Sequence, residues 1–375
     1  MEPIHIIGGG IGGLALANSL QCQGIDFKIF EQAPRLTEVG AAISISKAAL
    51  DILEKLDLHE QIKNAGYETI NFRIADKNLR NIRVTSTESP VTIIHRAKLI
   101  DILVSKLPKE KIRLNSKLTT IRNKRDFSDL NFSDGLEVKS GCTAIAEGIN
   151  SISRKQIFPN IKTRYAGQTI WRGITNIDVS TQYHRTYTEI WANKKRFLFV
   201  PMDKSTMFWL AIKNARVGGE DNPDTIREEL AHEYNDFHPF VKELLLNSAN
   251  FIRSDLADLG NEKRKWYHGK VVFIGDAIHA TTPNLAQGGC QAIEDAYCLS
   301  VLMKRSAQGF SEIFPTFQRL REKKVSMIVN ASWKFGKIAH HPILSAMAKY
   351  YLKYMPTRSV VSLEKKLNDL SYLNH

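Results

Sequence analysis

The chain has 375 residues and should hold about two domains, each with its own core. Its residues are 43% hydrophobic and 24% charged, a composition typical of an ordinary soluble protein. No apolar run approaches the roughly 20 residues of a membrane span, so we expect no integral membrane association.

The formal net charge of +13 is compatible with three kinds of partner: nucleic acid, an anionic membrane or an anionic small molecule. The basic residues are scattered apart from short clusters at 263–265 and 321–324, and no nucleic-acid motif accompanies them. We therefore expect no nucleic-acid partner. A solvated basic surface is the simplest interpretation, and attraction of an anionic small molecule is the functional one.

The four cysteines form no C-x-x-C pair and have no metal-ligand spacing with histidine. Free thiols in a reducing compartment are the simplest interpretation, so we expect a cytoplasmic protein without a metal site. The apolar N-terminus lacks the basic stretch of a signal peptide and is dense with glycines, and we interpret it as mature sequence.

The first 40 residues predict a βαβ unit that binds a nucleotide. Gly8, Gly10 and Gly13 have G-x-G-x-x-G spacing. Such glycines let the backbone approach a pyrophosphate, whose charge then lies at the positive end of a helix. Glu31 is placed to accept hydrogen bonds from a ribose. The predicted elements of this unit are a strand at 4–7, a helix over 14–23 and a strand over 27–30.

Short helices and strands follow up to residue 148. The small-residue segment 40–43 would run close to a ligand. Arg96 begins a helix, where it is equally suited to meet a phosphate or ribityl hydroxyl and to serve as a capping or surface arginine. Asp134-Gly135 predicts a hairpin turn. The predicted elements are helices at 48–58 and 98–107 and strands at 71–84, 91–94, 111–121, 130–139 and 144–148.

From residue 165 the pattern becomes β-rich and aromatic, which indicates a separate antiparallel sheet. An apolar strand predicted at 271–274 resembles the buried strands of the first domain, and Gly275 and Asp276 follow it. The elements predicted here are strands at 168–174, 186–192, 196–201 and 207–212, a helix over 226–248, a loop over 277–289, a helix beginning near 289, and helices from 313 onward with breaks near Pro342 and Pro356.

The predicted fold class is α/β, with a Rossmann-like nucleotide-binding domain, an inserted antiparallel-sheet domain and C-terminal helices. The expected boundaries are 1–70, 93–164 and 256–335 for the discontinuous nucleotide-binding domain, 71–92 and 165–255 for the substrate domain, and 336–375 for the C-terminal helical segment.

Three motifs occur along the chain: Gly8 to Gly13 with Glu31; Ala146-Glu147-Gly148 with Ser151 and Arg154; and Gly275-Asp276-Ala277-Ile278-His279 with Pro283, Gln287-Gly288 and Glu294-Asp295. In these motifs and in their order, the chain resembles the single-component FAD-dependent monooxygenases, and the resemblance covers about residues 1–335. The resemblance is to the hydroxylases of salicylate, 3-hydroxybenzoate, 6-hydroxynicotinate and urate, and more distantly to zeaxanthin epoxidase.

The resemblance implies an FAD domain of the glutathione-reductase type and reduction of bound FAD by transiently bound NADPH or NADH. It also implies that O2 forms a flavin C4a-hydroperoxide, whose distal oxygen goes to an aromatic or heteroaromatic small molecule. The protein's task is then to orient the substrate and exclude water.

Asp276 lies where an open α/β sheet binds its ligand and would hold ribityl hydroxyls, with a helix cap as the alternative. The helix starting near Gly288 would direct its positive end at the flavin pyrimidine, and Pro283 would leave room for oxygen. The predicted cofactor-binding residues are Gly8, Gly10, Ile11, Gly12, Gly13, Glu31, Gln32, Arg35, Ala42, Arg96, Glu147, Gly148, Gly275, Asp276, Pro283, Gln287, Gly288 and Gly289.

The predicted catalytic residues are Arg172, Pro283 and Gly288. Arg172 shares a strand face with Gln168 and Ile170; it would bind a substrate carboxylate or contact the flavin, and an exposed strand arginine is the equal alternative. His279 is expected to be structural, and the sequence does not name a general base. Five further residues are pocket candidates, each better explained individually as core: Tyr187, Glu189, Trp191, Phe199 and Trp209.

Two residues depart from the family pattern. Glu147 stands where relatives have aspartate, which would weaken or re-aim the nicotinamide contact, and Ala286 stands where they have glycine, which would narrow the flavin loop.

The alternatives to aromatic hydroxylation are epoxidation of a polyene, hydroxylation of a polycyclic antibiotic, and a flavin-binding redox sensor without turnover. We expect a monomer or homodimer, in which segment 357–373 covers its own chain or joins a partner subunit.

Overall fold

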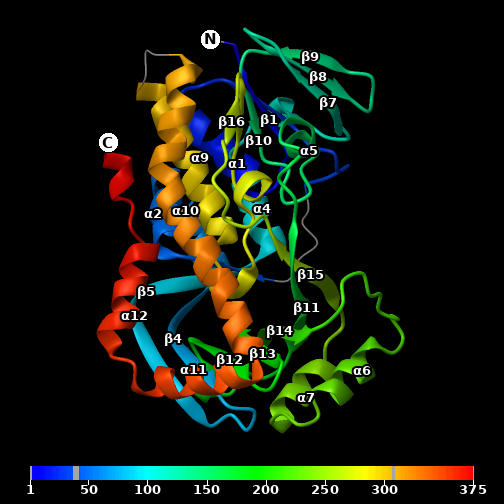
Figure 1. The fold of residues 1–375 in the computed structure, drawn as a ribbon, viewed down its shortest axis with the longest axis vertical. Coiled ribbons are helices and arrows are strands. Elements are labelled where there is room, and N and C mark those ends of the chain that lie inside the picture. Colours follow the sequence, from blue (N-terminus) through cyan, green and yellow to red (C-terminus); the bar gives the residue numbers. More distant parts are fainter. Residues whose placement is uncertain (1, 37–41, 306–308, 375) are drawn as a thin grey trace.

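The computed structural model describes residues 2–36, 42–305 and 309–374. Its strands form three sheets, and one long helix, α10 (Phe310–His340), runs down the molecule beside two of them (Figure 1). At 31 residues, α10 is about 46 Å long. It therefore links the part of the protein that holds the glycine loop to the part that holds the largest sheet.

A six-stranded sheet carries the glycine loop. Its strands run parallel except for the edge strand β16, which is antiparallel to its neighbour. The apolar residues of β1 are buried on both sides, as is typical of a parallel sheet covered on both faces. The strand order is β16 (Tyr267–His268), β17 (Val271–Phe273), β10 (Thr143–Ile145), β1 (Ile4–Ile7), β2 (Phe27–Phe30) and β6 (Ile112–Arg113).

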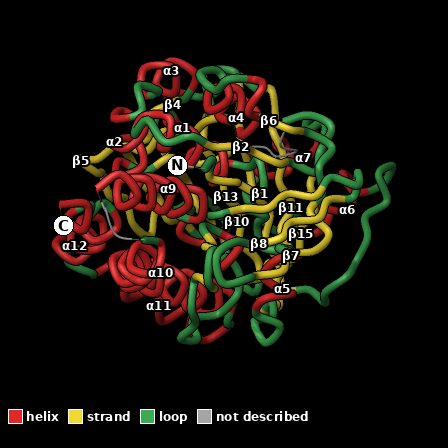
Figure 2. The backbone as a smooth tube through the Cα atoms, turned by 90° about the horizontal axis from the view of Figure 1, so that it is seen from above, coloured by secondary structure: helices red, strands yellow, loops and turns green. Residues whose placement is uncertain are grey.

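Helices and a small sheet cover the two faces of this parallel sheet. Helix α1 (Ile11–Cys22) packs against α9 (Gly288–Arg305), as Figure 2 shows from above. On the side of the small sheet, Phe30 stacks on Phe132 with ring centroids 4.6 Å apart. The small sheet contains β7 (Leu118–Asn123), β8 (Ser128–Phe132) and β9 (Glu137–Ser140), and the predicted hairpin turn lies between the last two. The predicted Rossmann-like domain is confirmed.

An eight-stranded sheet forms the second part of the molecule. Its neighbouring strands are antiparallel except for β12 and β4, which run parallel. Strand β3 lies within the segment 1–70 that was predicted to belong to the nucleotide-binding domain, yet it pairs with β5. The strand order is β15 (Ile252–Asp258), β11 (Arg164–Asn176), β14 (Thr206–Asn214), β13 (Lys195–Pro201), β12 (Thr186–Trp191), β4 (Tyr67–Ala75), β5 (Asn81–His95) and β3 (Ala42–Ile45).

One face of the large sheet is covered by α6 (Ile226–Glu233) and α7 (Pro239–Leu246). The prediction of one helix over 226–248 is wrong because Pro239, which has no N–H, begins a new helix at its first position. Several aromatic side chains of the sheet are buried against these helices: Trp171, Phe197, Phe199 and Trp209.

The remaining helices connect the sheets or extend the C-terminal portion. The predicted breaks near Pro342 and Pro356 are confirmed. The prediction of a loop over 277–289 is wrong in part, because single turns of helix form at α8 and η3. These elements are α2 (Lys47–Lys55), α3 (His59–Ala65), α4 (Arg96–Val104), α5 (Ile152–Ile157), α8 (Asp276–His279), α11 (Pro342–Tyr354), α12 (Thr357–Leu367), and the 3-10 turns η1 (Lys109–Lys111), η2 (Thr181–Tyr183), η3 (Pro283–Leu285) and η4 (Ser371–Asn374).

The cysteines are free: Cys22 is exposed and the other three are buried. None of the helices in the described ranges combines the length and the apolar character needed to cross a bilayer.

Candidate active site

The glycine loop between β1 and α1 is closed so tightly that side chains do not fit. Gly8 has a φ of 108°, and a Cβ built there would lie 2.5 Å from the Ala146 carbonyl oxygen. A Cβ on Gly13 would lie 1.9 Å from the carbonyl oxygen of Gly8. Gly10 caps α1 without a side-chain hydrogen bond, so the first N–H groups of the helix are presented by bare backbone. This geometry suits a pyrophosphate at the helix N-terminus.

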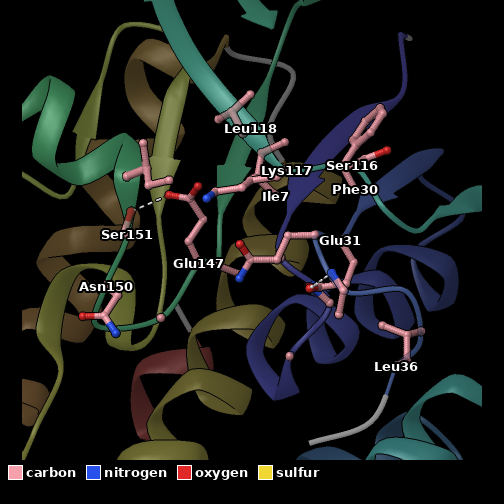
Figure 3. A pocket seen from close by; sticks show the side chains of 18 of the residues that line it. Ile7, Phe30, Glu31, Leu36, Ser116, Lys117, Leu118, Glu147, Asn150 and Ser151 are labelled. Atoms are coloured by element: carbon pink, nitrogen blue, oxygen red, sulfur yellow. Dashed lines mark hydrogen bonds between the residues drawn. The ribbon is translucent and has the colours of Figure 1, made fainter. Parts of the chain in front are cut away.

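Glu31, at the end of β2, holds the loop in place. Its Oε2 accepts a hydrogen bond from the Gly9 N–H at 2.6 Å, and its Oε1 accepts one from the Ala33 N–H at 2.8 Å (Figure 3). The carboxylate therefore orders the backbone on either side of the site where the sequence predicts a ribose.

Beside the loop lies a cleft of about 450 Å³. Sequence reasoning did not find the part of its lining that comes from the end of the segment between β6 and β7 and the first residue of β7, namely Ser116, Lys117 and Leu118, because these residues carry no motif. The cleft brings together seven of the predicted cofactor-binding residues: Gly8, Gly10, Glu31, Gln32, Arg35, Glu147 and Gly148.

Glu147 lies across the cleft from Glu31 (Figure 3). Its Oε2 accepts hydrogen bonds from the Ser151 hydroxyl at 2.5 Å and the Ser153 N–H at 3.0 Å. The carboxylate thus stabilises the N-terminus of α5, where a negative charge is favourable.

The Glu147 segment is tied to the Gly275-Asp276 segment through Arg154, which is buried. Its Nη1 donates to the Ala277 carbonyl oxygen at 3.0 Å, and its Nη2 donates to the Ile149 carbonyl oxygen at 2.6 Å. Two of the motifs that resemble the monooxygenases are therefore joined by one side chain.

Asp276 is separated from the last strand residue of β17 by Ile274 and Gly275, and it begins α8. Solvent reaches its side chain, but desolvation by the surrounding protein raises the pKa of the carboxyl, against the opposing effects of His279 and Arg96. A Cβ on Gly288, at the start of α9, would lie 3.7 Å from Asp276 Oδ1. The predicted residues Asp276 and Gly288 are therefore neighbours at the carboxyl edge of the parallel sheet.

His279 has a structural contact, as predicted. Its Nε2 lies 2.5 Å from Asp295 Oδ2, and the same carboxylate oxygen accepts a hydrogen bond from the Gly275 N–H at 2.9 Å. Gly275 has a φ of 57°, and a Cβ there would lie 2.9 Å from the Cβ of Ala292. This cluster fixes the turn that presents Asp276.

Arg172 lies on β11 and donates a hydrogen bond from Nη1 to Ser254 Oγ at 3.1 Å. Burial, and then the neighbouring charge of Arg96, lower its pKa to about 10. The charge of Arg96 thus acts on both Asp276 and Arg172. Within the described part of the chain, Arg172 lies outside the linings of the cleft and of the second cavity described next.

A second cavity, of about 320 Å³, lies between the large sheet, η3 and α12. Gln287 and Ala286 border it, and Ala286 has left-handed backbone angles, φ 52° and ψ 32°, which glycine adopts more easily. The sequence indicated two of its lining residues, Tyr187 and Glu189, as pocket candidates, but it did not predict that η3 and α12 enclose a cavity with them. The apolar lining includes Phe72, Val91, Ile93, Phe335, Val360, Leu363 and Leu367.

A buried polar network lies behind this cavity. Arg196 donates from Nη1 to Glu189 Oε1 at 2.8 Å, from Nε to His340 Nε2 at 2.8 Å, and from Nη2 to Asn284 Oδ1. Burial, and then Arg196, lower the pKa of His340 to about 3, so its neutral ring accepts from Arg196 and donates from Nδ1 to the Lys194 carbonyl oxygen. The network fixes Asn284, which follows Pro283 in the turn η3, against the large sheet.

The pocket candidates of the large sheet divide into two groups. Tyr187 and Glu189 line the second cavity. Trp191 is buried against Phe335, and Phe199 and Trp209 belong to the core under α6 and α7.

The other predicted cofactor-binding residues lie nearby in the chain's first elements and at the start of α9. Ile11, Gly12 and Gly13 lie in α1, and Ala42 lies on β3. Gly289 approaches Ile43 so closely that a Cβ built on Gly289 would lie 2.6 Å from Ile43 Cδ1. Residues 40 and 41 lie outside the described ranges.

Comparison with known proteins agrees with this geometry. A family model described as "FAD binding domain" matches residues 1–331. The chain is 34% identical to aurachin C monooxygenase/isomerase of Stigmatella aurantiaca, over 89% of each chain. It is 29% identical to 2-heptyl-3-hydroxy-4(1H)-quinolone synthase of Pseudomonas aeruginosa strain UCBPP-PA14, again over 89% of each.

Among solved structures, Klebsiella pneumoniae HpxO complexed with FAD and uric acid has a TM-score of 0.90 to this chain, with 22% identity and 98% of each chain covered. This likeness agrees with the fold described above. The chain therefore belongs to the FAD-binding-domain family, and it is an FAD-dependent monooxygenase.

Proposed function

We propose that the enzyme hydroxylates a heteroaromatic ring that carries an apolar chain, with a reduced nicotinamide nucleotide as the reductant. The observation that carries this proposal is the second cavity, because most of its wall surface is apolar while polar side chains, among them Thr69, Glu189 and Asn284, also line it. Its volume of about 320 Å³ lies within the range of about 300–1,000 Å³ for small-molecule sites.

The residues present fit FAD, as the closed glycine loop and the solvent-facing carboxylate of Asp276 indicate. In this proposal the cleft beside Gly8 holds the adenosine and pyrophosphate, and Asp276 holds ribityl hydroxyls. Helix α9 begins at Gly288 and directs its positive end toward the flavin ring. When bound, FAD accepts a hydride and activates dioxygen, which is the chemistry that the protein's own side chains lack.

The protein's contribution is to orient the substrate and to keep water away. Glu189 Oε1 accepts hydrogen bonds from Trp191 Nε1 and Arg196, and its other carboxylate oxygen is our candidate acceptor for an N–H or O–H proton of the substrate ring. Thr69, which also lines the cavity, has a buried hydroxyl that lacks a hydrogen-bond partner within the described ranges. A polar group of the substrate would satisfy it.

The named product of one relative supports an apolar chain on the ring. The Pseudomonas enzyme is named for a quinolone that bears a heptyl group and a hydroxyl group. The apolar side chains of α12 would accommodate such a chain, and burying it would contribute about 0.8 kcal/mol per methylene group.

The test is NAD(P)H oxidation by the purified yellow holoenzyme with three compounds: 2-heptyl-4(1H)-quinolone, 4(1H)-quinolone without the chain, and uric acid. We expect the alkylated compound to accelerate NAD(P)H oxidation most and to gain one oxygen atom, detected by mass spectrometry. Preference for uric acid would contradict the proposed substrate class. If none of the three compounds changes the rate of NAD(P)H oxidation, another class of substrate is favoured, such as a polyene or a polycyclic antibiotic.

A further inference from the structure

The C-terminal helix α11 carries an apolar face that points away from the protein. Its exposed fractions are 67% for Ile343, 64% for Met347, 71% for Tyr350, 62% for Tyr351 and 63% for Tyr354. With a period of 3.6 residues, these five positions share one face of the helix. A surface helix ordinarily turns its apolar face toward the core, so this orientation requires an explanation.

The opposite side of α11 is fixed to the body of the protein. Arg83 of β5 donates hydrogen bonds from Nη1 to the carbonyl oxygens of Leu352 and Met355, at 2.8 Å and 2.6 Å. Ser345, on that side, is buried. In Figure 1, α11 lies along the outside of the molecule beside β4 and β5, and α12 continues from it. The apolar face is therefore held outward by a defined attachment.

Basic side chains on α11 and on the helix that follows it favour a negatively charged partner. Lys353 flanks the apolar face on α11, and its Nζ lies 5.5 Å from the ring centroid of Tyr354. Arg358, Lys365 and Lys366 are exposed on α12. The whole chain carries a formal charge of +13, which opposes contact with a second copy of itself. Tyrosine and lysine around an apolar strip are typical of helices that lie in a membrane interface.

We propose that α11 docks the enzyme on the surface of a membrane that contains anionic lipid. The face formed by Ile343, Met347, Tyr350, Tyr351 and Tyr354 enters the boundary between head groups and acyl chains, and the neighbouring lysines meet the lipid charges. Docking of this kind is peripheral. If the proposed function is correct, it also brings α12, which lines the substrate cavity, to the lipid phase where a substrate with an apolar chain dissolves.

The test is co-sedimentation of the holoenzyme with vesicles, without substrate. One vesicle type contains phosphatidylcholine alone, and the other contains phosphatidylcholine and phosphatidylglycerol in a ratio of about 3:1, so that anionic lipid supplies the electrostatic attraction. We expect binding to the anionic vesicles and weaker binding at high salt. The variant Ile343→Gln/Met347→Gln/Tyr350→Gln should reduce the partition coefficient at least about tenfold, because it removes apolar burial without changing charge.

Val217→Gln is the control, because Val217 is 65% exposed on a loop of the large-sheet part. It should bind vesicles as the unchanged enzyme does. Flavin absorbance and circular dichroism verify that each variant is folded. The proposal is overturned if the unchanged holoenzyme stays in the supernatant with anionic vesicles, or if the triple variant sediments equally. It is also overturned if the triple substitution dissociates a dimer, which would identify the face as an interface between copies. Since no substrate is present, these outcomes are independent of the proposed reaction.

Discussion

At the scale of single residues, two neighbouring glycines of one motif have different tasks. A Cβ on Gly13 would lie 1.9 Å from the backbone oxygen of Gly8, whereas a Cβ on Gly12 would lie 3.3 Å from the side chain of Ala292. We predict that Gly13→Ala displaces the loop and weakens FAD binding at least about 100-fold, or about 2.7 kcal/mol. FAD titration of the apoprotein measures this, with Gly12→Ala as the matched comparison.

Gly12→Ala should retain most of its flavin, since helix α1 has only to shift by a few tenths of an ångström against α9. Equal flavin loss in both variants would show that helix packing, and not the approach of the loop to the pyrophosphate, determines cofactor binding.

Glu189 is the second residue whose task can be tested. We predict that Glu189→Gln lowers kcat roughly 100-fold, because a neutral amide does not accept a proton. The flavin content should be unchanged. The lost activity should recover as the pH rises and the substrate deprotonates by itself. An equal loss at every pH would instead indicate a structural defect in the Arg196 network. Glu68→Gln, which breaks an exposed pair with Arg185, is the control.

At the scale of elements, the sequence predicted what is encoded locally. The strand before Gly8, the helix after it and the acid at the end of β2 are contiguous in the chain, so their pattern alone places the cleft. The second cavity was not predictable in this way, because Val91, Phe335 and Leu367 come from three distant segments and meet only through tertiary packing. The same holds for β3, whose pairing with β5 depends on where the large sheet ends.

Helix α12 allows a sharp test of the cavity, because adjacent valines have different positions on it. Val360 lines the cavity, whereas Val361 is 40% exposed. We predict that Val360→Ala raises KM for the alkylated substrate about five- to tenfold, since roughly 1–1.5 kcal/mol of apolar contact is lost. Steady-state kinetics measure the change. Val361→Ala makes the same chemical change and should leave KM unaltered. If both variants respond alike, α12 does not contact the substrate.

At the scale of the whole molecule, a buried ionic cluster joins α9, α10 and the C-terminal turn. Arg321 pairs with Glu294 at 2.7 Å and with Asp295 at 2.8 Å, and all three side chains are fully buried. Tyr372, near the C-terminus, donates a hydrogen bond to Glu294 at 2.7 Å. Burial opposes ionisation of Asp295, but His279 and Arg321 outweigh it and hold the pKa of its carboxyl below the usual value.

Because its pKa is lower in the folded state, Asp295 contributes stability that is complete above its unfolded-state pKa, about 4. That stability is lost as the pH falls through the folded-state value. We predict that Arg321→Met lowers the free energy of unfolding by about 3–5 kcal/mol at pH 7, since the two buried carboxylates lose the guanidinium that they share. Glu294 then keeps Lys324 and Tyr372 as partners, and Asp295 keeps His279.

The same substitution should change the response to acid. Without Arg321, burial favours the protonated carboxyls, so the stability difference between the two proteins should narrow as the pH falls toward about 4, where carboxyls that have lost the guanidinium take up protons. Urea unfolding midpoints measured between neutral pH and this value follow the change. Arg319→Met, at an exposed position on the same helix, should have little effect at any pH. A difference that stays constant or widens on acidification would mean that packing, and not charge compensation, is what Arg321 supplies to the junction of α9 and α10.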